Sequence, residues 1–206
     1  EVLDFWLGPP ATTEAEGLDK IRRWFLSGTT LDAVVRERFG ATVAAALDGR
    51  LADWADDADG ALALVIVLDQ LTRHVHRDDP RAYAGDALAI EVATRAIERG
   101  DLERHPELPA RMFLASPWHH AEDLELQRRH EAIARAHVEG APAQYRRMAE
   151  TGLEQSAKWR GVIERFGRFP HRNAVLGRAS TPEELDFLAT FAQAGPPRLA
   201  RELDRR

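Results

Sequence analysis

Apolar residues recur at intervals of three and four positions along most of this chain. Leu18, Ile21 and Trp24 follow this spacing within residues 14–26, and a second series follows it through residues 31–47. Such spacing places apolar side chains on one face of an α-helix. No segment sustains the alternation of apolar and polar residues that is typical of a half-buried strand, so the pattern predicts an all-α fold.

Residues 61–68 are the longest uninterrupted apolar run and open a segment that extends to residue 75. A run that is apolar on every side indicates either a helix buried on all faces or a buried parallel strand. The segment continues through Asp69, Gln70 and Arg73 without a turn signal, which favours the helix. We expect it to be the most buried helix of the fold.

Glycine, proline and capping residues divide the rest of the chain into further helices. Asp79 before Pro80 and the Thr181-Pro182-Glu183-Glu184 capping box are both typical of helix starts. The remaining predicted helices cover residues 80–99, 108–115, 118–139 after a restart at Ser116-Pro117, 143–166, and a last segment from 182 onward.

Together these segments predict about eight or nine helices joined by short turns. Successive helices of this kind pack as antiparallel hairpins, and no strict repeat is present, so a degenerate helical array stays open. A length of 206 residues suits one domain, residues 1–206. Residues 198–206 form a charged tail that is expected to fray.

The composition excludes several classes of function. A net charge of −6 and a pI near 5.8 argue against nucleic-acid binding, which depends on many basic residues. Because the chain has no cysteine, disulfides, thiolate metal sites and cysteine nucleophiles are excluded. No apolar run approaches the roughly 18 residues of a membrane span, and the N-terminus does not resemble a signal peptide. We therefore expect a cytoplasmic protein without a membrane partner.

The first candidate site is a carboxylate at the end of the apolar run. Asp69 is expected to be desolvated there and to need a cationic or hydrogen-bonding partner. Arg73, one helical turn later, is the nearest candidate, and Arg77 follows after another turn. The sequence allows both a buried ion pair that fixes helices and a carboxylate that belongs to a functional site.

The second candidate site is a run of histidines and acids near the start of the predicted helix 118–139. His119 and Glu122 are three positions apart, as are His120 and Asp123, so each pair is predicted to share a helix face. Acids in a first helical turn are also favoured by the helix dipole, which gives them a purely structural explanation. A metal site is the weaker interpretation, because no second Glu-x-x-His pair is present.

The third candidate site is the run of residues 165–173, which crowds arginines and aromatic residues around a glycine and a proline. Phe166 and Phe169 are expected to anchor the turn that Pro170 forces. Arginine forks suit the recognition of carboxylate or phosphate, but they also neutralise buried acids such as Asp69 and Glu122. The polar members of this run are Arg165, Arg168, His171, Arg172 and Asn173.

The chain resembles a bacterial family known as domain of unknown function 924. The residues that carry the resemblance are Leu3-Asp4-Phe5-Trp6 with Gly8, Trp24-Phe25, Leu68-Asp69-Gln70 with Arg73 and Arg77, Arg81-Ala82-Tyr83 with Asp86, Glu122-Asp123 with Gln127, residues 163–173, Leu176-Gly177-Arg178, Ser180-Thr181 and Glu183-Glu184. The resemblance covers nearly the whole chain, and it implies an all-helical fold similar to a tetratricopeptide superhelix without strict repeats. It implies no particular activity.

The chain departs from the family pattern at several polar positions. It has Leu71-Thr72-Arg73-His74 where the family often has Phe-Pro-Arg-Asn, and Trp159-Arg160-Gly161 where the family tends to have His-Arg-Asp. It also has His120-Ala121-Glu122 in place of His-Ser-Glu. The missing histidine and aspartate near residue 160 weaken a metal or acid–base assignment there, whereas Asp69, Glu122 and the arginines are retained.

Three hypotheses of function follow from these clusters. The leading one is a polar pocket that binds a small anionic ligand, and its predicted residues are Asp69, Arg73, Arg77, His120, Glu122, Asp123, Arg165, Arg168, His171, Arg172 and Asn173. The second is a scaffold that binds another protein through a large exposed apolar or aromatic groove, with the polar clusters serving structure only. The third is a metal-dependent enzyme centred on His119, His120 and Glu122. No other cofactor is expected, and acid–base chemistry by these histidines is chemically feasible.

Overall fold

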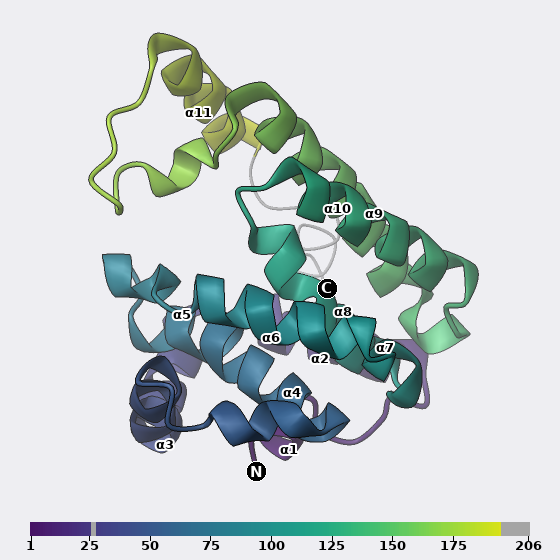
Figure 1. The fold of residues 1–206 in the computed structure, drawn as a ribbon. Helices are drawn as coiled ribbons and strands as arrows, with labels where there is room; N and C mark the ends of the chain where they lie inside the picture. Colours follow the sequence, from purple (N-terminus) through teal and green to yellow (C-terminus); the bar gives the residue numbers. More distant parts are fainter. Residues whose placement is uncertain (26–27, 195–206) are drawn as a thin grey trace.

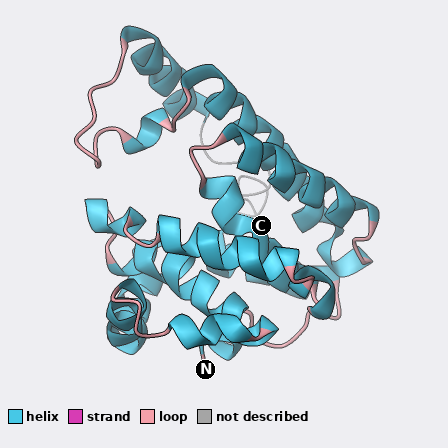
Figure 2. Cartoon of the chain, viewed as in Figure 1, coloured by secondary structure: helices cyan, strands magenta, loops and turns pink. Residues whose placement is uncertain are grey.

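The computed structural model describes residues 1–25 and 28–194, and within these ranges the chain is helical and contains no strand (Figures 1 and 2). The all-α prediction is confirmed, and the parallel strand considered for residues 61–75 is wrong. The predicted charged tail, residues 198–206, lies outside the described residues. Among the helices of the described part, none combines the length and apolar character needed to cross a membrane.

Helices of very different length follow one another along the chain, joined by short turns. The α-helices are α1 (Val2–Trp6), α2 (Glu14–Phe25), α3 (Gly28–Leu47), α4 (Ala58–Val65), α5 (Thr72–Val75), α6 (Asp86–Glu98), α7 (Asp101–Arg104), α8 (Leu108–His120), α9 (Leu124–Glu139), α10 (Arg146–Phe166) and α11 (Pro182–Ala194). The shorter elements are the 3₁₀ turns η1 (Ala52–Asp56), η3 (Pro80–Tyr83), η4 (Ala143–Tyr145) and η5 (Pro170–Arg172), and the π-helical segment η2 (Ile66–Leu71).

A continuous helical rod formed by α4, η2 and α5 runs through the main core. Every side chain from residue 61 to residue 69 is buried, because α3, α6 and α8 all pack against this rod. Trp6 of α1 and Trp24 of α2 cover another part of the core, where both contact the ring of Phe113 edge-on. The apolar run therefore lies where its composition predicted, at the centre of the packing.

The middle of the rod, η2, is π-helical, which the sequence did not predict. A π-turn holds one more residue than an α-turn and is frequent at functional sites. Val67 O accepts the Thr72 N–H, which closes the wider turn, and also accepts a hydrogen bond of 2.9 Å from Thr72 Oγ1. Asp69 lies within this segment.

The turn between η3 and α6 approaches the rod very closely at Gly85. A Cβ atom added at this glycine would lie 2.4 Å from Leu68 O, so only glycine fits without a backbone shift. The close contact brings Tyr83 and Asp86, on either side of Gly85, next to the turn that carries Asp69.

The break between α8 and α9 lies later than the sequence predicted. Pro117 does not restart a helix but lies inside α8. Its ring removes the N–H that would bind Phe113 O. Ser116 Oγ lies 2.8 Å from that carbonyl, but its single proton is donated to Asp69 Oδ2, which lies 2.7 Å away. Gln127 then closes the end of α8, since its Nε2 donates to His119 O at 2.6 Å and to Ala121 O at 2.9 Å.

Because α8 ends at His120, residues 121–123 form a linker rather than the first turn of a helix. Asp123 is the N-cap of α9. The prediction that His119 and Glu122, and likewise His120 and Asp123, share one helix face is therefore wrong.

The helices α9 and α10 run side by side along one edge of the molecule (Figure 1). Near the C-terminal end of α10 they form, with η5 and α11, a second and smaller core around Val162, Ile163 and Phe169. The predicted capping box starts α11: Glu184 N lies 3.2 Å from Thr181 Oγ1, and Glu184 Oε2 accepts from Thr181 N at 2.8 Å.

Candidate functional site

Four segments that are far apart in the sequence meet around Asp69. We call this group the inner cluster: Asp69 and Arg73 of the central rod, Asp86 of α6, His120 of α8 and Arg172 of η5. The Asp69 carboxylate is 1% exposed, and its Oδ1 lies 2.7 Å from His120 Nδ1 and 3.0 Å from Arg73 Nη1. Its Oδ2 accepts from Ser116 Oγ at 2.7 Å and from Gln70 Nε2 at 2.6 Å. Both oxygens of this buried acid are thus satisfied.

The surroundings of Asp69 hold it in the ionised form. Burial alone would raise the pKa of this carboxyl. The charges of His120 and Arg73, and hydrogen bonds from His120 and Ser116, outweigh burial and lower the pKa well below its usual range. Asp69 is therefore a permanent negative charge at the floor of the inner cluster.

Both arginines of the inner cluster contact Asp86. Arg73 Nη2 lies 2.9 Å from Asp86 Oδ1, and Arg172 Nη1 lies 3.3 Å from Asp86 Oδ2. The two guanidinium groups also lie over the ring of Tyr83, at 5.5 Å and 4.8 Å from its centroid. Burial raises the pKa of Asp86 despite the opposing charge of Arg73, and the nearby charge of Asp69 raises it further.

Arg172 is the most enclosed cation of the inner cluster, with a side chain that is 8% exposed. Its Nη2 donates to His120 O at 2.9 Å, but its buried Nε has no acceptor among the described residues. Burial lowers the pKa of this guanidinium, although the charge of Asp86 counteracts the shift. A buried N–H without a partner typically costs about 1–3 kcal/mol.

Three histidine rings lie together, and one of them contacts Asp69. The ring of His119 lies 5.4 Å from that of His120 and 4.8 Å from that of His130. Burial and the neighbouring His130 lower the pKa of His119 well below its ordinary value, and burial lowers that of His130 to about 3. His130 Nδ1 bonds Ser156 Oγ at 2.9 Å, so among the three only His120 is backed by a carboxylate.

A second group of ion pairs holds η5 and the start of α11 in place. We call it the outer network: Glu122, Arg168, Asn173, Arg178 and Glu184. Glu122 accepts from Phe169 N at 2.8 Å and from both Nη atoms of Arg178, at 2.6 Å and 2.9 Å. Arg168 forms a two-pronged pair with Glu184, whose pKa the Arg168 hydrogen bond and the Thr181 N–H lower to about 2.

The predicted site residues therefore divide into separate groups. Asp69, Arg73, His120 and Arg172 meet in the inner cluster, whereas Glu122, Arg168 and Asn173 belong to the outer network. The other four lie elsewhere: Arg77 binds Asp32 of α3 at 2.7 Å, Asp123 caps α9, Arg165 pairs with Glu183 on the surface, and His171 packs against the rings of Trp159 and Phe169.

The residues that the structure describes offer no ligand set for the metal hypothesis. Among the described residues, no group of three or more His, Asp or Glu is arranged to hold a metal ion. Glu122, the acid of that hypothesis, is instead occupied by Arg178 and Phe169 N. Its carboxylate therefore faces η5 rather than His119 and His120.

Several residues of these clusters were not among the predicted site residues. From the sequence, Asp86 has a purely structural explanation, as an acid in the first turn of a helix. Ser116 is likewise explained as an N-cap before a proline. Tyr83 and Arg178 are among the residues of the family resemblance and Glu184 belongs to the capping box, but none of the three shows these tertiary contacts in its local sequence. Asp86 and Tyr83 flank Gly85, which packs against the backbone of the central rod. A glycine between two helices is the sequence feature that could have indicated this close contact between backbones.

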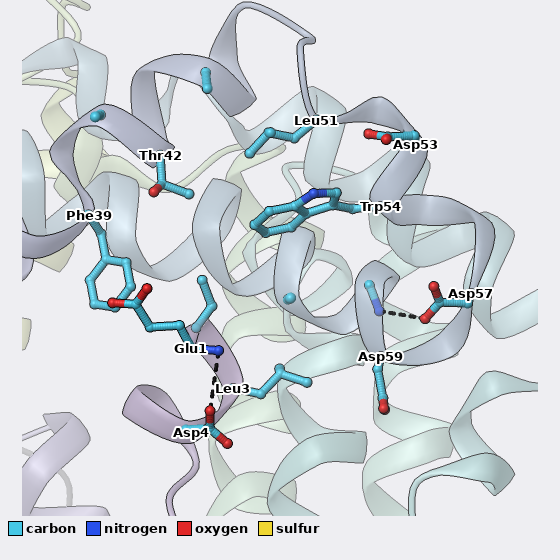
Figure 3. Close-up of a pocket in the computed structure, with 15 residues that line it drawn as sticks. Glu1, Leu3, Asp4, Phe39, Thr42, Leu51, Asp53, Trp54, Asp57 and Asp59 are labelled. Atoms are coloured by element: carbon cyan, nitrogen blue, oxygen red, sulfur yellow. Dashed lines mark hydrogen bonds and ion pairs between the residues drawn. The ribbon is translucent and has the colours of Figure 1, made fainter.

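A hollow with a volume of about 900 Å³ lies elsewhere, between α1, α3, η1 and α4 (Figure 3). Phe39, Leu51 and Trp54 provide its apolar lining, and carboxylates such as Asp53 and Asp57 lie at its edge. It shares no residue with the inner cluster. Clusters of desolvated, paired charges are frequent at functional sites, so the inner cluster is the stronger candidate site of the two.

Comparison with known proteins identifies relatives of the chain. The sequence matches the family described as a bacterial protein of unknown function (DUF924) over residues 2–191. A solved structure of a protein of unknown function from Agrobacterium tumefaciens is similar, with a TM-score of 0.69 and 33% sequence identity over 85% of this chain and 96% of that chain. No curated protein matches the sequence. The chain therefore belongs to the DUF924 family, the family that its motifs resemble.

Proposed function

We propose that the protein binds a small anion with a carboxylate or phosphate group at the inner cluster. The observation that supports this most directly is the buried Nε of Arg172, which has no acceptor among the described residues, in a cluster where two arginines share Asp86. An anion oxygen would supply the missing acceptor. Guanidinium forks bind both carboxylate and phosphate oxygens in this way.

The charges of the inner cluster can adjust to an incoming anion. When Asp69 and Asp86 are both ionised, they balance Arg73 and Arg172. Burial raises the pKa of Asp86, so Asp86 is the acid most readily neutralised when an anion competes for the two guanidinium groups. Protonation of Asp86 leaves one net positive charge, which the anion then balances.

The cluster can be reached from solvent without unfolding. The side chains of Arg73, Asp86 and His120 are 23%, 19% and 27% exposed, whereas Asp69 beneath them is 1% exposed. Three charged groups of the cluster are therefore partly accessible to a small anion, whereas Asp69 is not.

Thermal unfolding in the presence of inorganic phosphate or acetate tests this proposal. At a concentration about 100 times Kd, binding adds about 2.7 kcal/mol and raises the midpoint of a protein of this size by roughly 5–10 °C. Arg73→Gln is expected to remove most of this rise, and Arg172→Lys, which keeps the charge but loses the fork, should reduce it.

Arg165→Gln is the matched control, because Arg165 forms an exposed pair with Glu183 outside both clusters. This variant should keep the full rise. An equal rise in the wild-type protein, Arg73→Gln and Arg172→Lys would mean that the anions act on the protein surface in general, and the proposal would be wrong.

A further inference from the structure

We infer that the inner cluster also carries out proton abstraction, with His120 Nε2 as the general base toward an anion held by Arg73 and Arg172. This inference rests on the anion-binding function proposed above. It adds a reaction class, the reversible removal of a proton from a carbon next to a carbonyl group.

The tautomer of His120 follows from its partner. Asp69 is buried and ionised, so its Oδ1 can only accept a hydrogen bond, and His120 Nδ1 at 2.7 Å must be the donor. In the neutral ring the proton is then on Nδ1, and Nε2 carries the free lone pair. Hydrogen bonds from Ser116 and Gln70 to the other oxygen of Asp69 prevent the carboxylate from turning away.

The free nitrogen of His120 is available for chemistry. Nε2 of this ring forms no hydrogen bond with any residue that the structure describes, and the side chain is 27% exposed. The neighbouring His130 is bonded to Ser156, and the Nδ1 atom of His119 is buried. His120 alone of the three combines an acidic partner with access from solvent.

Both arginines of the inner cluster lie beside His120. Arg73 Nη1 and His120 Nδ1 contact the same oxygen atom, Asp69 Oδ1, and Arg172 Nη2 donates to His120 O at 2.9 Å. A 2-oxo acid whose carboxylate binds these guanidinium groups carries its acidic C–H bonds two carbons from the carboxylate, and the proposed reaction places these bonds at His120 Nε2.

The proton transfer balances without a further reactant. Nε2 takes the proton from the carbon and becomes part of an imidazolium, which the negative charge of Asp69 stabilises. The electron pair of the broken C–H bond stays on the substrate as an enolate, whose oxygen the guanidinium of Arg73 stabilises. Return of a proton from Nε2 to the carbon restores the starting state.

Exchange of the methyl protons of pyruvate in deuterated water, followed by proton NMR, tests this inference. The wild-type protein should accelerate the loss of the methyl signal in a saturable manner. His120→Gln should lower the protein-dependent rate by roughly 100-fold or more, the usual effect of losing a general base. His76→Gln, a change outside both clusters, should leave the rate unchanged.

A separate measurement tests whether Asp69 fixes the tautomer of His120. Nitrogen NMR of the wild-type protein should show His120 with a protonated Nδ1 and an unprotonated Nε2, and Asp69→Asn should change this tautomer. The reverse tautomer in the wild-type protein would overturn the inference even if Asp69→Asn failed to fold.

The outcomes separate this inference from the proposed function. If pyruvate raises the unfolding midpoint but its methyl protons exchange no faster than in buffer, the site binds anions and the general base is wrong. If pyruvate, acetate and phosphate all fail to raise the midpoint, both proposals are wrong. Exchange that is unaffected by His120→Gln would assign the reaction to another group and contradict the inference.

Discussion

At the scale of single residues, the most informative groups are half-buried histidines whose charged form is disfavoured by loss of solvent. Burial and the charge of His120 lower the pKa of His130 to about 3, and burial lowers that of His119 as well. A histidine in an unfolded chain has a pKa of about 6.5, so the unfolded state binds protons that the folded state does not. The stability that these residues contribute is therefore complete above about pH 6.5 and is lost as the pH falls.

We predict that the free energy of unfolding decreases between pH 7 and pH 5, and that His130 accounts for about 1–2 kcal/mol of the decrease. Urea unfolding of the wild-type protein and of His130→Asn at the two pH values measures this. The carboxyl groups with lowered pKa values, Asp69 and Glu184, lose their contribution only below about pH 4.5 and do not interfere in this interval. An identical pH dependence in the variant would contradict the prediction.

Some site residues could be identified from their neighbours in the sequence, whereas others could be identified only from the folded structure. Asp69 was recognisable because an acid directly after a buried apolar run needs a partner, and Arg73 was recognisable at helical spacing from it. Asp86 and Ser116 contact the same cluster from α6 and α8, and their own neighbours in the sequence give no sign of it. A partner chosen by tertiary packing leaves no local pattern.

At the scale of elements, the site depends on how closely α6 approaches the π-helical segment. The same close contact at Gly85 sets the positions of Tyr83 and Asp86, on which both arginines of the inner cluster rely. The hydrophobic pattern predicted the helices around this contact well, because burial of an apolar face depends on local spacing. It did not predict η2, because in a run that is apolar on every side the spacing does not distinguish a π-turn from an α-turn. It did not predict the extension of α8 through Pro117, because a proline after a serine is also typical of a helix start.

We predict that Gly85→Ala destabilises the fold by about 1–3 kcal/mol, the usual cost of overpacking, because the new methyl group overlaps Leu68 O. The same variant should also weaken phosphate binding, since Asp86 and Tyr83 must move away from Arg73. Urea unfolding and thermal shifts measure the two effects.

Gly40→Ala is the matched control for this prediction. Gly40 lies inside α3, and an added Cβ would meet no atom within 4 Å. Alanine should stabilise this helix by about 1 kcal/mol, because glycine has the lower helix propensity. Destabilisation by both variants to the same extent would show that the close contact with η2 is not the cause.

At the scale of the whole molecule, the inner cluster joins the main core to the smaller core. Asp69, Asp86 and His120 belong to helices of the main core, whereas Arg172 comes from η5, which packs with α10 and α11. Arg172 therefore contacts Asp86 and His120 only if the smaller core is fixed relative to the main core. The outer network fixes it, since Glu122 in the linker after α8 binds both Phe169 N and Arg178.

We predict that Glu122→Gln weakens phosphate binding about tenfold, a change of about 1.4 kcal/mol, although Glu122 is not part of the inner cluster. The neutral amide binds Arg178 less strongly, so η5 should move more freely and present Arg172 less often in its binding position. Amide hydrogen exchange should accordingly become faster in residues 169–173 but not in residues 61–69 of the central rod.

Glu183→Gln, which removes an acid from an exposed pair with Arg165, is the control and should change neither measurement. Faster exchange at residues 169–173 with unchanged phosphate affinity would mean that the anion is held by Arg73 without Arg172, and the ligand would then have to lie entirely on the main core.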